Sequence, residues 1–278
     1  MNVKLIALDM DGTVLLDDHR SVTERTVKTI TRAAARHILV VPTSGRIISV
    51  MPETVMSLPA VQFAITSNGA LAYRLKDNKV IYSNYIPPEN AAAVFRTIPK
   101  TMWAELWANG KIYMERDKFL HRSDYPLNPF HAEVIQKIGM EIGSLTSAEA
   151  LPGLIEKINL PCILPTLKQK LWAEFSSWGS FSLIDTPNGF EIMNRGTSKA
   201  VGLSGLCRRL YQDGAEVQRQ NIIAFGDSEN DIDMLQTSGF GIAMGNACER
   251  VKEAADAVTR RNTEDGVAFA IERYVTGT

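Results

Sequence analysis

The chain has 278 residues, with 30 lysine or arginine residues against 31 aspartate or glutamate residues, and its formal net charge is −1. This balance gives no electrostatic reason to expect nucleic acid or a membrane surface as the main partner. No apolar run approaches the roughly 20 residues of a membrane-spanning helix, and we expect no signal peptide. The three cysteines lack ligand spacing and are expected to be reduced thiols of a cytoplasmic protein. A chain of this length favours two domains.

The first expected element is a buried strand that ends in two acids. Five apolar residues and a lysine, residues 3–8, run into Asp9 and Asp11, and Gly12 and Thr13 follow. A continuous run of this kind is typical of a buried strand in a parallel sheet. Both acids then lie at the carboxyl end of the strand, where ligands of open α/β sheets bind. Two carboxylates this close repel each other, so a divalent cation is the obvious companion.

The segments that follow alternate between helical and strand patterns. A helix is expected up to about His37, with Ser21 and Glu24 at the spacing of a capping box, and a buried strand is expected over 38–41. A strand–helix–strand unit with short connections implies right-handed parallel pairing. Further expected elements are a helix over 47–58, a strand over 63–65, a hairpin over 71–75 and 80–82 with its turn at 77–78, a helix that begins near Lys199, a strand over 222–225, a helix over 230–236, strands over 240–244 and 257–258, and a helix over 264–274.

The composition changes between about 84 and 190. Pro87 and Pro88 mark a break, and all four tryptophans of the chain fall in this stretch, where we expect them to form a core. We predict an inserted α+β domain over 84–190. Its expected elements are helices over 89–98 and 167–178, strands over 112–116, 156–160 and 181–184, and a proline-rich loop over 124–130.

Polar side chains follow the expected strands of the remaining sequence. Ser44 follows the second strand, Asp227, Asn230 and Asp231 follow a late strand, and Lys199 begins a helix. Carboxylate oxygens suit Mg²⁺, whose coordination is usually completed by water and substrate phosphate. A hydroxyl, a lysine and the N–H groups of glycine turns suit a phosphoryl group. These residues therefore predict phosphoryl transfer, with an aspartate free to act as the nucleophile.

Four motifs in this order resemble those of the haloacid dehalogenase-like phosphatases. They are Asp9-Met10-Asp11-Gly12-Thr13, Thr43-Ser44-Gly45-Arg46, Lys199 and Gly226-Asp227-Ser228-Glu229-Asn230-Asp231. More narrowly, residues 67–70, 243–247 and 262–267 resemble segments of the Cof-type branch of that family. The resemblance implies an α/β fold, with a Rossmann-like parallel-sheet core over 1–83 and 191–278 and an inserted α+β cap over 84–190.

The resemblance also implies catalytic roles. Asp9 would attack phosphorus and become an aspartyl phosphate. Asp11 would protonate the leaving oxygen and then activate the hydrolytic water. Because its side chain needs no metal contact, Asp11 can carry a raised pKa and act as an acid. Lys199 would hold the phosphate and keep Asp9 ionised.

Binding roles follow in the same way. The phosphoryl group would be bound by Ser44, Gly45, Lys199 and Asn230, and serine keeps the hydroxyl where the family often has threonine. Mg²⁺ would be bound by Asp9, by the backbone carbonyl of Asp11 and by Asp227. Asp231 would complete the metal site, close to the metal together with Asn230.

The expected function is a Mg²⁺-dependent phosphatase of small phosphorylated metabolites, sugar phosphates first. The cap would exclude bulk water and select the leaving group. One alternative is a phosphomutase on the same scaffold. A second is a non-catalytic receiver or metabolite-binding protein whose Asp9 is phosphorylated as a signal. The sequence leaves the oligomeric state open.

Overall fold

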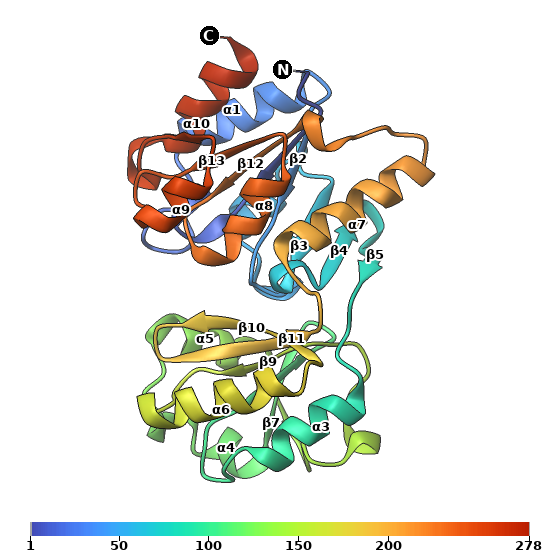
Figure 1. Ribbon diagram of the computed structural model, residues 1–278, viewed down its shortest axis with the longest axis vertical. Helices are drawn as coiled ribbons and strands as arrows, with labels where there is room; N and C mark the ends of the chain where they lie inside the picture. Colours follow the sequence, from blue (N-terminus) through green and yellow to red (C-terminus); the bar gives the residue numbers. More distant parts are fainter. Residues whose placement is uncertain (1, 278) are drawn as a thin grey trace. The chain divides into compact units, whose positions relative to one another are not determined.

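The computed structural model describes residues 2–277, which divide into two compact units (Figure 1). The core unit comprises the chain up to Arg46, Met51–Ser83 and the chain from Ser198 onwards. The insert unit comprises Ile47–Val50 and Asn84–Thr197. The domain boundaries expected from the sequence, at 83/84 and 190/191, stay a prediction. Among the described residues, no helix is both long and apolar enough to span a bilayer.

The core unit is built on a parallel sheet of five strands in the order β14-β13-β12-β1-β2. All of its strand pairs are parallel. Strand β1 is wholly buried and has a neighbour on each side, so that Ala7 pairs with Val41 and with Ala224. The expected α/β fold with a parallel-sheet core is thus confirmed. The strands are β1 (Leu5–Leu8), β2 (Leu39–Pro42), β12 (Ile222–Gly226), β13 (Phe240–Ala243) and β14 (Ala257–Val258).

Helices α7 and α8 pack apolar side chains against this sheet. Leu203 and Leu206 of α7 and Met234 of α8 pack with Leu5 and Ala7 of β1 in one hydrophobic cluster. Helices α1 and α10 pack against each other beside the sheet (Figure 1). The helices of the unit are α1 (Glu24–Ala34), α2 (Glu53–Met56), α7 (Lys199–Gln212), α8 (Ile232–Thr237), α9 (Glu249–Ala254) and α10 (Gly266–Ile271).

A second, antiparallel sheet of the core unit contains β3 (Phe63–Thr66), β4 (Leu71–Arg74) and β5 (Lys79–Ser83). The predicted hairpin is confirmed, and Asn78 takes the left-handed conformation that its turn requires, with φ of 49°. An isolated parallel bridge joins Ile65 to Thr43 at the end of β2. Because of this bridge, the end of β3 lies beside the carboxyl edge of the parallel sheet, where β1 and β2 also end.

Two local expectations for the first 58 residues are wrong. The first helix is capped by Thr23, whose hydroxyl accepts a hydrogen bond from the Thr26 amide at 3.2 Å, whereas the Ser21 hydroxyl donates to Asp18. The helix expected over 47–58 is a 3₁₀ turn, Ile48–Val50, followed by the short α2. Pro52 separates the two because proline has no amide hydrogen and its ring blocks the preceding turn of a helix.

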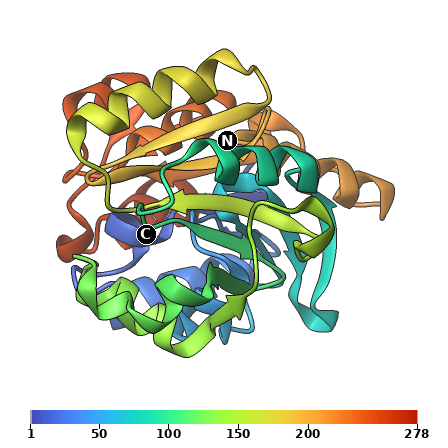
Figure 2. The ribbon, with the colours of Figure 1, turned by 90° about the horizontal axis from the view of Figure 1, so that it is seen from below.

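The insert unit has a six-stranded sheet in the order β10-β11-β9-β6-β7-β8, antiparallel except for the β7–β8 pair. Helix α6 lies along strand β10 of this sheet (Figure 2). Its strands are β6 (Glu105–Ala108), β7 (Lys111–Glu115), β8 (Gly139–Ile142), β9 (Ile155–Leu160), β10 (Phe181–Thr186) and β11 (Gly189–Asn194). Its helices are α3 (Pro88–Thr97), α4 (Arg116–Leu120), α5 (Pro129–Ile138) and α6 (Pro165–Ser177).

The insert therefore has the expected mixture of helices and strands, with one further correction. The loop expected over 124–130 ends early, since α5 begins at Pro129 and Asn128 caps it by accepting from the His131 amide at 2.8 Å. Proline suits this first helical position because its missing amide would have no partner there. Trp103 and Trp107 are buried, as expected of core residues.

Candidate active site

Three carboxylates meet at the carboxyl edge of the parallel sheet. Asp9 directly follows β1, and Asp227 directly follows β12, which is the neighbour of β1 in the sheet. Asp231 lies one turn further along the same loop. One carboxylate oxygen from each of the three residues lies within 4.8 Å of the others. The exposed fraction is 4% for Asp9 and 0% for Asp231, so these charges are removed from water.

Lys199 supplies the positive charge of this cluster. Its ammonium donates to Asp9 Oδ1 and, at 2.6 Å, to Asp231 Oδ1. Burial alone would lower the pKa of Lys199, but the Asp231 and Asp9 carboxylates outweigh it and raise that pKa above its ordinary value. Lys199 is therefore charged at neutral pH. Its position is set by the first turn of α7, where the Ser198 hydroxyl accepts from the Val201 amide at 3.3 Å.

The cluster carries more negative than positive charge. Burial raises the pKa of Asp9 well above its usual range, and Asp231 and Asp227 raise it further, whereas Lys199 lowers it. Burial and the Asp231 carboxylate likewise raise the pKa of Asp227. When all three carboxylates are ionised, they exceed the single ammonium by two negative charges, and burial together with this repulsion raises the pKa of Asp9 and Asp227. A divalent cation would balance this excess.

Hydrogen bonds fix the two later carboxylates. The Thr13 hydroxyl donates to Asp227 Oδ1 at 2.8 Å, and the Ser228 hydroxyl donates to Asp227 Oδ2 at 3.2 Å. The amides of Asp227 and Ser228 donate to Asp231 Oδ2 at 3.1 and 3.0 Å. Gly12 has φ of 76°, and a Cβ atom there would overlap the Asp227 carboxylate. Only glycine suits this position, for both reasons.

The donor chemistry of the cluster fits a hard divalent cation. Its ligand atoms are carboxylate oxygens, which Mg²⁺ and Ca²⁺ prefer to nitrogen or sulfur. In addition, Asn230 Oδ1, in the loop that carries Asp227 and Asp231, is buried and has no hydrogen-bond partner among residues 2–277. A buried acceptor without a donor is costly, and a cation or its bound water would satisfy it.

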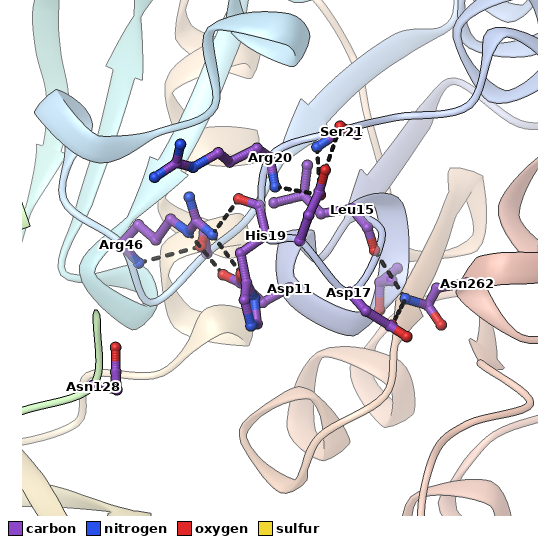
Figure 3. A network of polar contacts seen from close by, with 12 residues as sticks. Asp11, Leu15, Asp17, His19, Arg20, Ser21, Arg46, Asn128 and Asn262 are labelled. Carbon is purple, nitrogen blue, oxygen red and sulfur yellow. Dashed lines mark hydrogen bonds and ion pairs between the residues drawn. The ribbon is translucent and has the colours of Figure 1, made fainter. Parts of the chain in front are cut away.

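The Asp11 side chain points toward Arg46 and His19 (Figure 3). Arg46 binds it through two nitrogens, Nε to Oδ2 at 2.8 Å and Nη2 to Oδ1 at 2.5 Å. His19 Nδ1 lies 2.8 Å from Asp11 Oδ1. Burial alone would raise the pKa of Asp11, but the contacts with Arg46 and His19 outweigh it and lower the pKa. The expected raised pKa is therefore wrong in this arrangement, because the carboxylate faces a cation.

The segment after β2 lies at the same edge of the sheet. The Thr43 amide donates to the Leu8 carbonyl at 2.7 Å, which places Ser44 beside the end of β1. Ser44 is buried, and its hydroxyl accepts from the Arg46 amide at 3.2 Å. A Cβ atom on Gly45 would lie 3.0 Å from the Asn68 side-chain oxygen.

Two asparagines that sequence reasoning left without a role anchor the loop after β1. Asn262 Nδ2 donates to the Leu15 carbonyl at 3.0 Å and to Asp17 Oδ1 at 3.1 Å (Figure 3). Asn246 Nδ2 donates to the Gly12 carbonyl at 2.8 Å. Both belong to segments that resemble the Cof-type branch, so the signal was present in the sequence, but it did not reveal the partners. Arg46 likewise ended a named motif without an assigned role.

The fold and this arrangement define a class of enzyme. A family model described as haloacid dehalogenase-like hydrolase matches residues 6–271, and the chain belongs to this family. Members generally use a divalent metal, which agrees with the acidic cluster. The curated relatives of this chain are named as phosphatases, and the chain is a phosphoric monoester hydrolase of this family.

Individual relatives match over nearly the whole chain. The 5-amino-6-(5-phospho-D-ribitylamino)uracil phosphatase YcsE of Bacillus subtilis (strain 168) is 29% identical over 288 aligned positions, covering 99% of this chain and 97% of its own. A solved haloacid dehalogenase-like hydrolase from B. subtilis has a TM-score of 0.79 at 25% identity, covering 98% of this chain and 100% of its own. A solved subclass IIB sugar phosphatase has a TM-score of 0.78 at 22% identity. The match covers 98% of this chain and 99% of the solved chain, and the two share the fold.

Proposed function

We propose that this enzyme is a Mg²⁺-dependent phosphatase that hydrolyses small phosphorylated metabolites, sugar phosphates first, through an aspartyl phosphate at Asp9. The observation that carries the proposal is the buried cluster of three carboxylates around Lys199, with its excess of two negative charges. Relatives support the substrate class, since they are named for a phosphorylated ribitylaminouracil and for phosphoglycolate. A structural neighbour is named as a sugar phosphatase.

The metal would be held by the side chains of Asp9 and Asp227 and by the backbone carbonyl of Asp11, with Asp231 completing the site. Bound Mg²⁺ supplies positive charge that offsets the repulsion between an anionic nucleophile and the phosphoryl group. The phosphoryl oxygens would be bound by the Ser44 hydroxyl, the Gly45 amide, the Lys199 ammonium and the Asn230 side chain.

In the first step, a carboxylate oxygen of Asp9 attacks phosphorus, and the bond between phosphorus and the leaving oxygen breaks. The leaving oxygen takes a proton from the Asp11 carboxyl group, so that an alcohol departs. This step requires a protonated Asp11, and Arg46 and His19 stabilise its ionised form in the present arrangement. The proposal therefore includes release of Asp11 from these partners before the step.

In the second step, water attacks the phosphorus of the aspartyl phosphate. The Asp11 carboxylate takes the proton from this water, inorganic phosphate leaves, and the Asp9 carboxylate is regenerated. Lys199 remains protonated throughout and neutralises charge on Asp9 and on the phosphoryl group. Replacing Asp11 with Asn should remove turnover and leave metal binding largely intact, because the role assigned to its side chain is proton transfer.

The test is release of inorganic phosphate from a panel of phosphorylated metabolites and an aryl phosphate, with Mg²⁺ and with a chelator. We expect Mg²⁺-dependent release that Asp9→Asn abolishes. Asp77→Asn, which removes an exposed carboxylate from the β4–β5 hairpin, is the matched control and should retain activity. Isomerisation that needs a bisphosphate activator, without phosphate release, would instead support the phosphomutase. Absence of any turnover would support the phosphate receiver. The cytoplasmic location stays a prediction.

A further inference from the structure

A strained turn lies next to the candidate phosphate site. Ser67, Asn68 and Gly69 follow β3 and have consecutive φ angles of 51°, 54° and 94°. All three residues are buried. Left-handed backbone is unfavourable for a residue with a Cβ atom, although asparagine tolerates it better than most. Such strain persists only where the surrounding structure fixes it, and it concentrates at functional sites.

Backbone contacts place this turn between two segments of the site. The Ser67 amide donates to the Arg46 carbonyl at 2.8 Å, and the Asn68 amide donates to the Ser44 carbonyl at 2.9 Å. On its other side, a Cβ atom on Gly69 would overlap the Ser198 carbonyl oxygen. The turn therefore packs closely against both the Ser44 segment and the first turn of α7, which carries Lys199.

The Asn68 side chain reaches a third segment of the site. Its Oδ1 accepts a hydrogen bond from Asn230 Nδ2 at 3.0 Å, and it also packs against the Cα of Gly45, where a Cβ would lie 3.0 Å away. Turning the Asn230 amide over would bring its oxygen against Asn68 Oδ1, and two acceptors would then meet. The hydrogen bond uses one hydrogen of Asn230 Nδ2 and fixes the plane of the amide, so it sets the direction of the second Nδ2 hydrogen, which is the one able to donate to a phosphoryl oxygen.

We propose that Asn68 is a positioning residue of the phosphate site: its side chain orients Asn230, and its turn fixes the Ser44-Gly45 segment. The inference rests on the proposed function, because it treats Asn230, Ser44 and Gly45 as binding groups for the phosphoryl oxygens. Asn68 itself donates nothing to the substrate in this role. The left-handed backbone conformation of Asn68 brings its side-chain amide to Asn230.

The decisive variant is Asn68→Gly. Glycine adopts a φ of 54° without strain but lacks the side-chain amide, so the variant separates the backbone role from the side-chain role. We expect cooperative thermal unfolding to be retained, whereas kcat/KM and the affinity for inorganic phosphate, measured by titration calorimetry, each fall about tenfold. Asn78→Gly is the matched control, because Asn78 has a similar φ of 49° in the exposed hairpin turn. It should change neither quantity.

A double-mutant cycle with Asn230→Ala distinguishes positioning from a general structural effect. If Asn68 acts through Asn230, its replacement should matter little once the Asn230 side chain is gone. We therefore expect the double variant to bind phosphate less than about twofold more weakly than Asn230→Ala alone. Equal effects of Asn68→Gly in both backgrounds, or wild-type phosphate affinity in Asn68→Gly, would overturn the role of Asn68. Failure of the wild-type enzyme to release phosphate from any monoester would instead overturn the proposed function, since the calorimetric titration needs no turnover.

Discussion

Replacing Lys199 with methionine tests the electrostatic account of the acidic cluster. Methionine roughly keeps the length of the side chain but removes the ammonium that donates to Asp9 and Asp231. Asp231 would keep its two bonds from the amides of Asp227 and Ser228, so the loss falls mainly on Asp9. Removing one partner from a buried ion pair costs about 3–5 kcal/mol, because a buried charge is left uncompensated. We expect this loss in the free energy of unfolding in the absence of metal.

The loss should depend on pH in a defined direction. Burial and the neighbouring carboxylates already raise the pKa of Asp9 above its value in the unfolded chain, and loss of Lys199 would raise it further. Between these two pKa values the folded state binds more protons than the unfolded state, so stability falls as the pH rises. Protonation of Asp9 at low pH relieves the uncompensated charge. The destabilisation of Lys199→Met should therefore be smaller at about pH 5 than at about pH 8.

The assay is urea unfolding in the presence of a chelator at both pH values. Lys28→Met is the matched control, because Lys28 pairs with Glu24 on the exposed face of α1 and such exposed pairs contribute little. Addition of Mg²⁺ should restore part of the lost stability, since the cation would replace the missing positive charge. A Lys199→Met variant as stable as the wild type at about pH 8 would refute the reasoning, as would a destabilisation that grows toward low pH.

Three further predictions address individual contacts of the site. Thr13→Val removes the hydroxyl that donates to Asp227 Oδ1, so we expect Mg²⁺ affinity to fall about tenfold in titration calorimetry, and unchanged affinity would exclude this role. Gly12→Ala forces a Cβ atom against the Asp227 carboxylate at a positive φ. The free energy of unfolding in urea should fall by about 1–3 kcal/mol. An unchanged free energy would show that the loop relaxes to accept the Cβ atom. Arg46→Lys replaces the two-nitrogen contact with Asp11, whose pKa Arg46 lowers. That pKa should rise, so the limb of the kcat/KM profile that Asp11 sets should move to higher pH, and an unmoved limb would argue against the contact.

The core of the site followed from the sequence because it depends on strand ends. The uniform apolar run of β1 identified a buried parallel strand, and this placed Asp9 at the sheet edge. The same pattern in β12 placed Asp227 there as well. Since parallel strands all end at one edge, residues more than 200 positions apart could be expected to meet. The direction of the strands was therefore enough to predict that Asp9 and Asp227 lie at the same edge, without any knowledge of side-chain orientation.

Side-chain orientation was not accessible in the same way. The motif of Asp11 specifies residue types, but it does not specify that Asp11 turns toward Arg46 and His19, so its pKa was expected to move in the wrong direction. In the segment after β2, a single helix was expected to run through Pro52, whereas the structure has a 3₁₀ turn before it and a short helix after it. Both errors arose where one local contact or one missing amide overrides a pattern spread over many residues.

The insert unit was harder to predict because its buried strands contain charged residues. Glu105 in β6 is fully buried, and it accepts hydrogen bonds from the indole nitrogens of Trp103 and Trp107 and from Asn159. In β11, Glu191 pairs with the buried Lys157 of β9. A charged residue in a short segment indicates an exposed position unless its partners are known, and Asn159 and Lys157 are distant in sequence from Glu105 and Glu191. Strands β6, β8 and β11 were missed.

The central claim is that Asp9 carries the phosphoryl group during turnover. The direct measurement is acid quenching of the Asp11→Asn variant during reaction with an aryl phosphate and Mg²⁺, followed by mass spectrometry of its peptides. An aryl leaving group needs little protonation, whereas hydrolysis of the intermediate needs the base, so the phosphorylated enzyme should accumulate. The account predicts a phosphoryl group on Asp9, absent from the Asp9→Asn variant. Wild-type phosphate release with no label on Asp9, or with label on another residue, would contradict it.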